Sequence, residues 1–166
     1  MSKIRIMIVS DTHGNNRYLN KALEEAGAFD LFLHLGDLEG SEHFIDAFVK
    51  SKKEMIAGNN DYYIDYPDEK IIEVEGYRIW MTHGHRYQVY TGVSFLRDAA
   101  IKKGVDIVLF GHIHQPYLEQ EDLIILNPGS ISLPRQSDRI PTYAIMEIDE
   151  QGEISIAIKR VGQCRE

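Results

Sequence analysis

The sequence contains very little cysteine. Cys164 is the only cysteine among 166 residues, and it lies in a polar segment near the carboxyl end. Because no internal disulfide can form, the chain does not resemble the small disulfide-linked secreted proteins. The first residues alternate as a strand does and show no apolar signal-peptide core. We therefore expect a protein of the reducing cytoplasm.

Positive charge and long apolar runs are also scarce. Lys and Arg number 18 against 26 Asp and Glu, which gives a net charge of −8. No basic run is longer than Lys52–Lys53 or Lys102–Lys103. A chain this acidic has no general attraction to nucleic acid or to anionic membranes, so we expect neither as a partner. No apolar run exceeds strand length, which argues against a membrane span.

Several other patterns are missing. The sequence has no Gly-x-x-x-x-Gly-Lys-Ser/Thr loop and no Gly-x-Ser-x-Gly elbow, which argues against a nucleotide-triphosphate switch and a serine hydrolase. It also has no linker, internal repeat or low-complexity segment. We therefore expect one domain over residues 1–166, with residues 162–166 as a loose tail.

The apolar periodicity predicts an α/β fold. Its first half alternates strands and helices, which requires a parallel sheet with right-handed crossovers, whereas its second half contains two hairpins. Two sheets packed face to face, with helices outside, accommodate both halves. The expected strands are 3–10, 31–35, 54–57, 70–74, 77–82, 106–110, 123–126, 142–148 and 153–159, and the expected helices are 16–26, 41–51 and 92–103.

Five of these strands end in residues able to bind a metal. Each residue alone has an ordinary explanation, because Asp-x-His often forms a cap and Gly-Asp a turn. Together they indicate a metal site, and carboxylate with imidazole suits transition metals better than Ca or Mg. No thiolate takes part, which argues against a structural zinc site. The candidates are Asp11, His13, Asp37, Asn59, His83, His112 and His114.

The last two candidates alternate within Gly111-His112-Ile113-His114. This stretch follows an apolar strand, and the carboxyl ends of strands are where open α/β sheets bind ligands. Histidines at this spacing could bind one metal, or each could face a different metal of a pair. The spacing alone leaves both arrangements open.

The ordered blocks resemble the calcineurin-like metallophosphoesterase family. The resemblance covers about residues 3–160, and the small size together with Asn127-Pro-Gly-Ser130 resembles its compact prokaryotic phosphodiesterase branch. It implies a four-layer αββα sandwich of two mixed β-sheets flanked by helices. The blocks are Asp11-x-His13, Gly36-Asp37, Gly58-Asn59-x-Asp61, His83-Gly84 and Gly111-His112-x-His114.

The resemblance also implies a binuclear centre and a hydrolase. Asp37 would bridge two divalent transition metal ions, with manganese expected first and Ni, Zn, Fe or Co as alternatives. Such a pair, roughly 3.5–4 Å apart, holds a bridging hydroxide that attacks a small phosphodiester. A homodimer is plausible for the family. The first ion would take Asp11, His13 and His114, and the second would take Asn59, His83 and His112.

Charge counting favours a diester substrate. Two divalent ions with Asp11, Asp37 and a bridging hydroxide leave one positive charge, which a phosphodiester neutralises and a monoester dianion exceeds. Asn60 stands where many larger family members have a histidine, so we expect better rates with phenolate-like leaving groups than with alkoxides. His85 is the nearest alternative proton donor, or else a histidine that lines the site. Asp61 is expected to support its loop.

Two competing functions follow from the same residues. One is a non-catalytic protein-interaction scaffold on this fold, as in the retromer subunit with its degraded metal site, although all seven ligand positions are filled here. The other is a mononuclear regulatory site, which would leave half of the ligands unused.

Other aromatic and histidine residues have simpler expected roles. We expect His34 and Trp80 in the core and His43 facing solvent. A cluster of tyrosines could line a pocket for a base or aryl group, or could simply pack the loops. Its members are Tyr62, Tyr63, Tyr66, Tyr87 and Tyr90.

Overall fold

The computed structural model describes residues 3–162. The expected tail from residue 163 onward, with Cys164, lies outside the described residues. None of the described helices is both long and apolar enough to cross a membrane.

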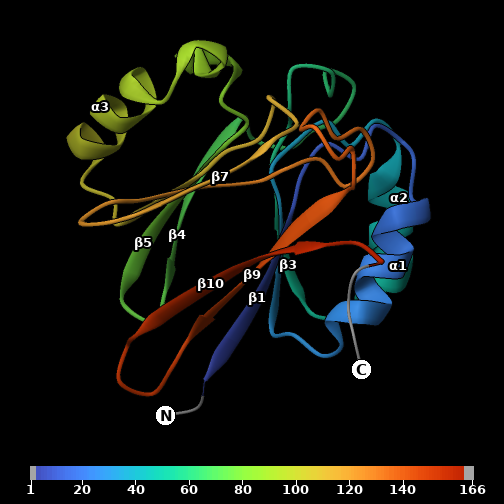
Figure 1. Ribbon diagram of the computed structural model, residues 1–166, viewed down its shortest axis with the longest axis horizontal. Helices are drawn as coiled ribbons and strands as arrows, with labels where there is room; N and C mark the ends of the chain where they lie inside the picture. Colours follow the sequence, from blue (N-terminus) through green and yellow to red (C-terminus); the bar gives the residue numbers. More distant parts are fainter. Residues whose placement is uncertain (1–2, 163–166) are drawn as a thin grey trace.

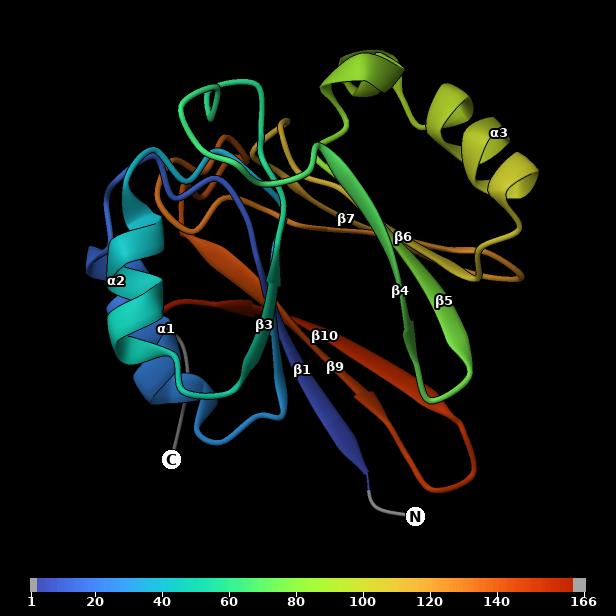
Figure 2. The same cartoon turned by 180° about the vertical axis from the view of Figure 1, so that it is seen from behind.

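The first sheet combines the parallel strands of the first half with the final hairpin (Figure 1). Strands β1, β2 and β3 run parallel, and β9 pairs antiparallel with β1. Helices α1 (Arg17–Ala26) and α2 (Ser41–Phe48) cover its outer face (Figure 2). In spatial order the strands are β10 (Ile154–Arg160), β9 (Thr142–Ile148), β1 (Ile4–Val9), β2 (Leu31–His34) and β3 (Lys52–Met55).

The second sheet is mixed. Strands β5, β6 and β8 run parallel at its centre, and β4 and β7 pair antiparallel at its edges. Helix α3 (Ser94–Lys103) covers its outer face, and the short 3-10 helices η1 (His85–Tyr87) and η2 (Val89–Thr91) precede it. In spatial order the strands are β4 (Glu69–Val74), β5 (Tyr77–Thr82), β6 (Ile107–Leu109), β8 (Ile124–Pro128) and β7 (Pro116–Gln120).

Three apolar layers hold the sandwich together. The central layer packs one face of each sheet against the other, with Ile6 and Ile8 in the same cluster as Met81 and Leu109. The alternate residues of β1 pack against α1 and α2, and Trp80 packs with α3 in the third layer. This period-2 division of buried residues explains why the strands read as continuous apolar runs. The expected four-layer α/β sandwich is confirmed, as is the core position of Trp80.

Several boundaries differ from the expectation. Helix α2 ends three residues early, at Phe48, and β3 begins two residues early, at Lys52. Strand β7 was not expected, because its residues alternate weakly and it lies at a sheet edge with most side chains partly exposed. The two 3-10 helices were also not expected, since such short turns have no apolar period.

The topology brings distant loops to one end of the molecule. The parallel strands β1 and β2 end at that end, and so do the parallel strands β5, β6 and β8. Figure 1 shows the loops that follow β1, β3 and β6 gathered above the two sheets. The candidate ligands lie in the loops that follow β1, β2, β3, β5 and β6.

Candidate metal centre

Most of the predicted ligands lie together at the carboxyl ends of the strands. Ligand atoms of Asp11, His13 and His114 all lie within 4.8 Å of one another, and so do those of Asp11, Asp37 and His83. Asp11 belongs to both groups. The structure therefore brings residues more than 100 positions apart in sequence into one cluster.

Among residues 3–162, one carboxylate oxygen of Asp11 is buried and has no hydrogen-bond partner. The Oδ2 atom accepts from the Ser10 hydroxyl (2.5 Å) and from the His112 N–H (3.1 Å), whereas Oδ1 accepts from nothing. The Nε2 atoms of three histidines face this Oδ1, at 3.3 Å for His114 and 3.7 Å for His13 and His83. An unsatisfied buried carboxylate oxygen is unfavourable, and a cation among these atoms would satisfy it. The donor set therefore fits a metal ion.

Three of these histidines are held by their other ring nitrogen. The Nδ1 atoms of His83 and His114 lie 2.8 Å from the carbonyl oxygens of Leu35 and Leu133, and Nδ1 of His13 hydrogen-bonds the Glu39 carboxylate. An Nδ1–H that donates to such an acceptor leaves the Nε2 lone pair free to bind a metal. The sequence analysis missed Glu39, whose only signal was its position two residues after Asp37.

The two alternating histidines have different neighbours. The His112 Nδ1 atom lies 3.3 Å from His83 Nε2, and the two rings are 5.1 Å apart. His114 instead lies against His13, with Nε2 atoms 3.1 Å apart and ring centroids 4.9 Å apart. His112 thus presents Nδ1 to the cluster, whereas His13, His83 and His114 present Nε2.

The backbone is strained at five candidate ligands. Non-glycine residues rarely adopt positive φ, and such strain concentrates at functional sites. The φ angles are 58° at Asp11, 49° at His13, 60° at Asp37, 74° at His112 and 59° at His114.

Asp37 is oriented by the residue that follows Asn59. The backbone N–H and the side-chain amide of Asn60 each donate to the Asp37 carboxylate at 3.0 Å. Asn59 itself is exposed, and within the described part of the chain its side chain makes no hydrogen bond to the other candidates. The structure therefore brings six of the seven predicted ligands together, and the role of Asn59 stays a prediction.

Asp61 fastens two metal-binding loops to each other. Its buried carboxylate accepts N–H bonds from Leu38 (3.0 Å), Glu39 (3.0 Å) and Gly58 (2.8 Å). This ties the loop after β3 to the loop after β2.

The charges of the cluster are strongly coupled. Burial opposes ionisation of Asp37, but the neighbouring His83 and Asn60 outweigh burial and hold its pKa well below the ordinary value. Burial likewise opposes protonation of His83, but Asp11 and Asp37 outweigh it and raise the pKa of His83 to about 9. Burial and the neighbouring His83 lower the pKa of His112 to about 4. The two carboxylates therefore draw positive charge into the cluster, which a proton on His83 supplies in part.

His85 and Tyr90 lie beside the cluster, and the Tyr90 ring is 4.9 Å from that of His112. The His85 ring lies 5.6 Å from that of His83 and 6.0 Å from that of His112, and burial lowers its pKa. Tyr62, Tyr63 and Tyr90 are 92%, 52% and 60% exposed. Of the remaining two tyrosines in the predicted cluster, Tyr66 packs beneath α2 and Tyr87 packs edge-on against Trp80.

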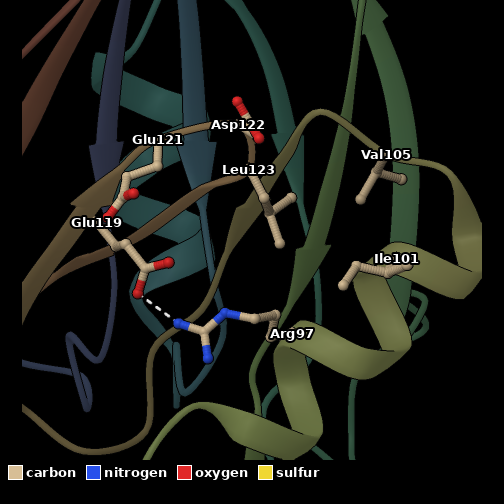
Figure 3. Close-up of a pocket in the computed structure, with 7 residues that line it drawn as sticks. All are labelled: Arg97, Ile101, Val105, Glu119, Glu121, Asp122 and Leu123. Carbon is tan, nitrogen blue, oxygen red and sulfur yellow. Dashed lines mark hydrogen bonds and ion pairs between the residues drawn. The ribbon is translucent and has the colours of Figure 1, made fainter.

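A cavity of about 440 Å³ lies between α3 and the β7–β8 turn, away from this cluster (Figure 3). Val105 and Leu123, in its wall, precede β6 and β8, so the cavity is at the amino ends of these strands, whereas His112 and His114 follow the carboxyl end of β6. An ion pair between Arg97 and Glu119 spans it. No candidate ligand lines this cavity.

The remaining two histidines match their expected positions. His43 is exposed on α2, and His34 is fully buried. The His34 Nδ1 atom accepts the Gly36 N–H (3.0 Å), so Nε2 carries the proton and donates to the Thr12 hydroxyl (3.1 Å). Burial lowers the pKa of His34 to about 4.

His34 is expected to make the metal-free protein sensitive to acid. Below the ordinary histidine pKa of about 6.5, His34 binds a proton in the unfolded chain, whereas in the folded protein it stays neutral down to about pH 4. The free energy of unfolding should therefore fall as pH decreases through this window, by about 3 kcal/mol from His34. Denaturant titrations at pH 7 and pH 4.5, with chelator present, measure this loss.

The matched variant is His34→Gln, because an amide cannot titrate. The variant should be less stable than wild type at pH 7, and the difference should shrink at pH 4.5. Parallel losses in the two proteins would show that other groups cause the acid sensitivity.

Comparison with known proteins identifies the family. Residues 4–151 match the calcineurin-like phosphoesterase superfamily domain. A probable metallophosphoesterase of Methanothermobacter thermautotrophicus is 32% identical over 163 residues, which cover 95% of this chain and 92% of the relative. A phosphodiesterase of Methanocaldococcus jannaschii is 29% identical, over 89% of this chain and 95% of the relative.

Solved structures agree in fold. An uncharacterized protein of Streptococcus pneumoniae, described as a predicted phosphoesterase, superimposes with a TM-score of 0.80 at 30% identity, over 96% of this chain and 91% of the other. A single mutant of Vps29 from Entamoeba histolytica superimposes with a TM-score of 0.75, over 95% and 99%, but at 18% identity it shows the shared fold alone. The chain therefore belongs to the calcineurin-like phosphoesterase superfamily, a family of metal-dependent phosphoesterases, as its ordered motifs predict.

Proposed function

We propose that this protein hydrolyses a small phosphodiester with the help of two divalent metal ions. The observation that carries the proposal is the buried, unpartnered Oδ1 of Asp11, which three imidazole Nε2 atoms face. When bound, such ions would lower the pKa of a water molecule and neutralise charge on the phosphate. The named phosphodiesterase among the relatives supports the same substrate class.

The neighbours of each histidine support two metal positions. Asp11, His13 and His114 would hold the first ion, and Asn59, His83 and His112 the second, with Asp37 between them. The support is that His114 lies against His13 whereas His112 lies against His83. Asp37 Oδ2 lies 3.7 Å from His13 Nε2 and 3.4 Å from His83 Nε2, as a bridging ligand requires.

Other residues of the chain would orient these ligands and deliver a proton. Asp61 would hold the loop after β2 and the loop after β3 in a fixed relative position, and Asn60 would hold the Asp37 carboxylate in place. Asn60 cannot change its charge state, so it cannot be an acid catalyst. His85 would be the donor to the leaving group, because its ring lies 5.6 Å from that of His83 and 6.0 Å from that of His112.

A comparison of two esters tests the substrate class. We expect kcat/KM for bis(4-nitrophenyl) phosphate to exceed that for 4-nitrophenyl phosphate by at least about tenfold, about 1.4 kcal/mol, because the diester matches the single positive charge of the loaded centre. The assay uses metal-stripped protein with Mn, Ni, Zn, Fe or Mg added back, and manganese is the expected activator. A preference for the monoester would contradict the diester assignment.

A second candidate function is a protein-interaction scaffold. The fold shared with Vps29 favours it, although the seven ligand positions here are all filled by residues able to bind a metal. If no added metal restores turnover of either ester, the scaffold becomes the better assignment.

We also propose that the protein is a single-domain cytoplasmic protein that forms a homodimer and does not bind nucleic acid or membranes stably.

A further inference from the structure

The loop that carries Arg135 is fastened to one of the candidate ligands. The Leu133 carbonyl oxygen lies 2.8 Å from His114 Nδ1, and the Arg135 N–H donates to the His114 carbonyl at 2.9 Å. These contacts on both sides of Pro134 fix the backbone of the loop relative to His114. The root of the Arg135 side chain is therefore held beside the cluster.

The Arg135 side chain is also linked through hydrogen bonds to His112, the other of the two alternating histidines. Its Nη1 donates to the Tyr90 hydroxyl at 2.6 Å, and that hydroxyl donates to the His112 carbonyl at 3.2 Å. The Tyr90 ring lies 4.9 Å from the His112 ring. Tyr90 thus positions an exposed guanidinium two hydrogen bonds from the backbone of His112.

The charge of Arg135 has no carboxylate partner among residues 3–162. Among residues 3–162, four other arginines form ion pairs with carboxylates, whereas Arg135, like Arg17, Arg78 and Arg139, forms none. Arg135 differs from these three in its hydrogen bonds to the Tyr90 hydroxyl and the His114 carbonyl, and it uses one of its five side-chain N–H donors on the neutral hydroxyl. A planar guanidinium with free donors is well suited to bidentate binding of a phosphate. The paired arginines are Arg5, Arg86, Arg97 and Arg160.

Glu39 and Arg135 place charges of opposite sign near the cluster. Glu39 places a carboxylate on His13, whereas Arg135 places a guanidinium beside Tyr90, on the side of His112 and His114. An anionic group that extends from a bound diester would be repelled at Glu39 and attracted at Arg135. We therefore expect such an anionic group to lie on the Arg135 side of the centre.

We infer that Arg135, positioned by Tyr90, binds a second anionic group of the substrate, a terminal phosphate separate from the diester that is cleaved. This inference rests on the proposed phosphodiesterase function. It narrows the substrate class to diesters that carry an additional phosphate, such as a 5′-phosphorylated dinucleotide.

The test compares the adenylyl dinucleotide with and without a 5′-terminal phosphate, using manganese-loaded protein. Wild type should prefer the phosphorylated form by about tenfold or more in kcat/KM, since hydrogen bonds between a guanidinium and a phosphate are charge-assisted and strong. Arg135→Gln should bring this ratio close to one, mainly through a higher KM. Arg135→Lys and Tyr90→Phe should give intermediate ratios, because each keeps the charge but loses the oriented fork.

Arg139→Gln is the matched control, because Arg139 is exposed on the same loop four residues later. It should leave both rates and their ratio unchanged. An equal loss on both dinucleotides in Arg135→Gln would assign the guanidinium to the scissile phosphate or to loop packing, and would overturn the inference. So would the absence of a preference in wild type.

Binding measurements separate this inference from the proposed function. Calorimetry of both dinucleotides with the same variants makes the comparison without turnover. If no phosphodiester is hydrolysed but wild type still binds the phosphorylated dinucleotide more tightly, and Arg135→Gln does not, the anion site stands and the proposed reaction fails. Equal binding of the two dinucleotides by wild type would overturn the anion site.

Discussion

Replacing His112 by Ala is expected to reduce the bound metal from two ions per chain to one and to lower turnover of a phosphodiester at least about a thousandfold, about 4 kcal/mol in transition-state stabilisation. His112 presents Nδ1 beside His83 Nε2, and the two residues would hold the second ion together with Asn59 and the shared Asp37. Without His112 the second position would keep only His83, Asn59 and the shared Asp37. Metal content by mass spectrometry and steady-state kinetics measure the two effects.

The control for this prediction is His43→Ala, which removes an exposed imidazole on α2. It should keep two ions and wild-type turnover. Circular dichroism should show that His112→Ala remains folded, because its partly exposed ring lies at the rim of the site. If His112→Ala retains two ions and turnover within tenfold of wild type, the division of ligands between two metals is wrong.

The strand ends were predictable because the strands themselves are strongly determined. β1, β2 and β6 consist mostly of buried apolar residues, and each is followed within two residues by glycine or by a polar residue. Parallel strands end at the same edge of a sheet, so a ligand-type residue after each strand is expected near the others. The sequence pattern therefore predicts that Asp11 lies near Asp37 at the end of the first sheet, and that His83 lies near His112 at the end of the second.

Contacts between loops were not predictable by the same reasoning. Glu39 reaches His13 across 26 residues, and Arg135 reaches Tyr90 across 45, through side chains that have no periodic pattern. The Asn59–Asn60 pair illustrates the same limit, because adjacent residues of equal chemistry differ in which one contacts Asp37. Edge strand β7 escaped prediction because an edge strand buries too little apolar surface to show a clear period.

Replacing Gly111 by Ala is expected to destabilise the protein by about 3 kcal/mol, at the upper end for overpacking a core, and to disrupt metal binding. A Cβ at this position would lie 2.1 Å from Ser10 Oγ and 2.8 Å from Asp11 Oδ2. Both residues are fully buried, and Ser10 Oγ also donates to Asp11, so neither side chain can move aside without displacing a ligand. Denaturant titration and calorimetric metal binding measure the two losses.

Gly104→Ala separates this steric effect from backbone strain. Gly104 ends α3 with φ 68° and ψ 35°, and a Cβ there would meet nothing within 4 Å. Alanine at such a left-handed position costs about 1 kcal/mol, and the variant should bind metal as wild type does. The φ angle of Gly111 is not positive, so this position requires glycine only because neighbouring atoms lie too close for a Cβ.

A double-mutant cycle with Ser10→Ala identifies the atom responsible. Ser10→Ala removes the Oγ that a Cβ at position 111 would strike, so the double variant should be more stable than the sum of the single changes predicts, by about 1 kcal/mol or more. Recovery should remain incomplete, because Asp11 Oδ2 still lies 2.8 Å from the added carbon. If Gly111→Ala proves as mild as Gly104→Ala and binds metal normally, the backbone between β6 and His112 has room to move. In that case the alternating histidines would not be held in place by their contact with β1, and the rigidity of the centre would have to come from the metal ions themselves.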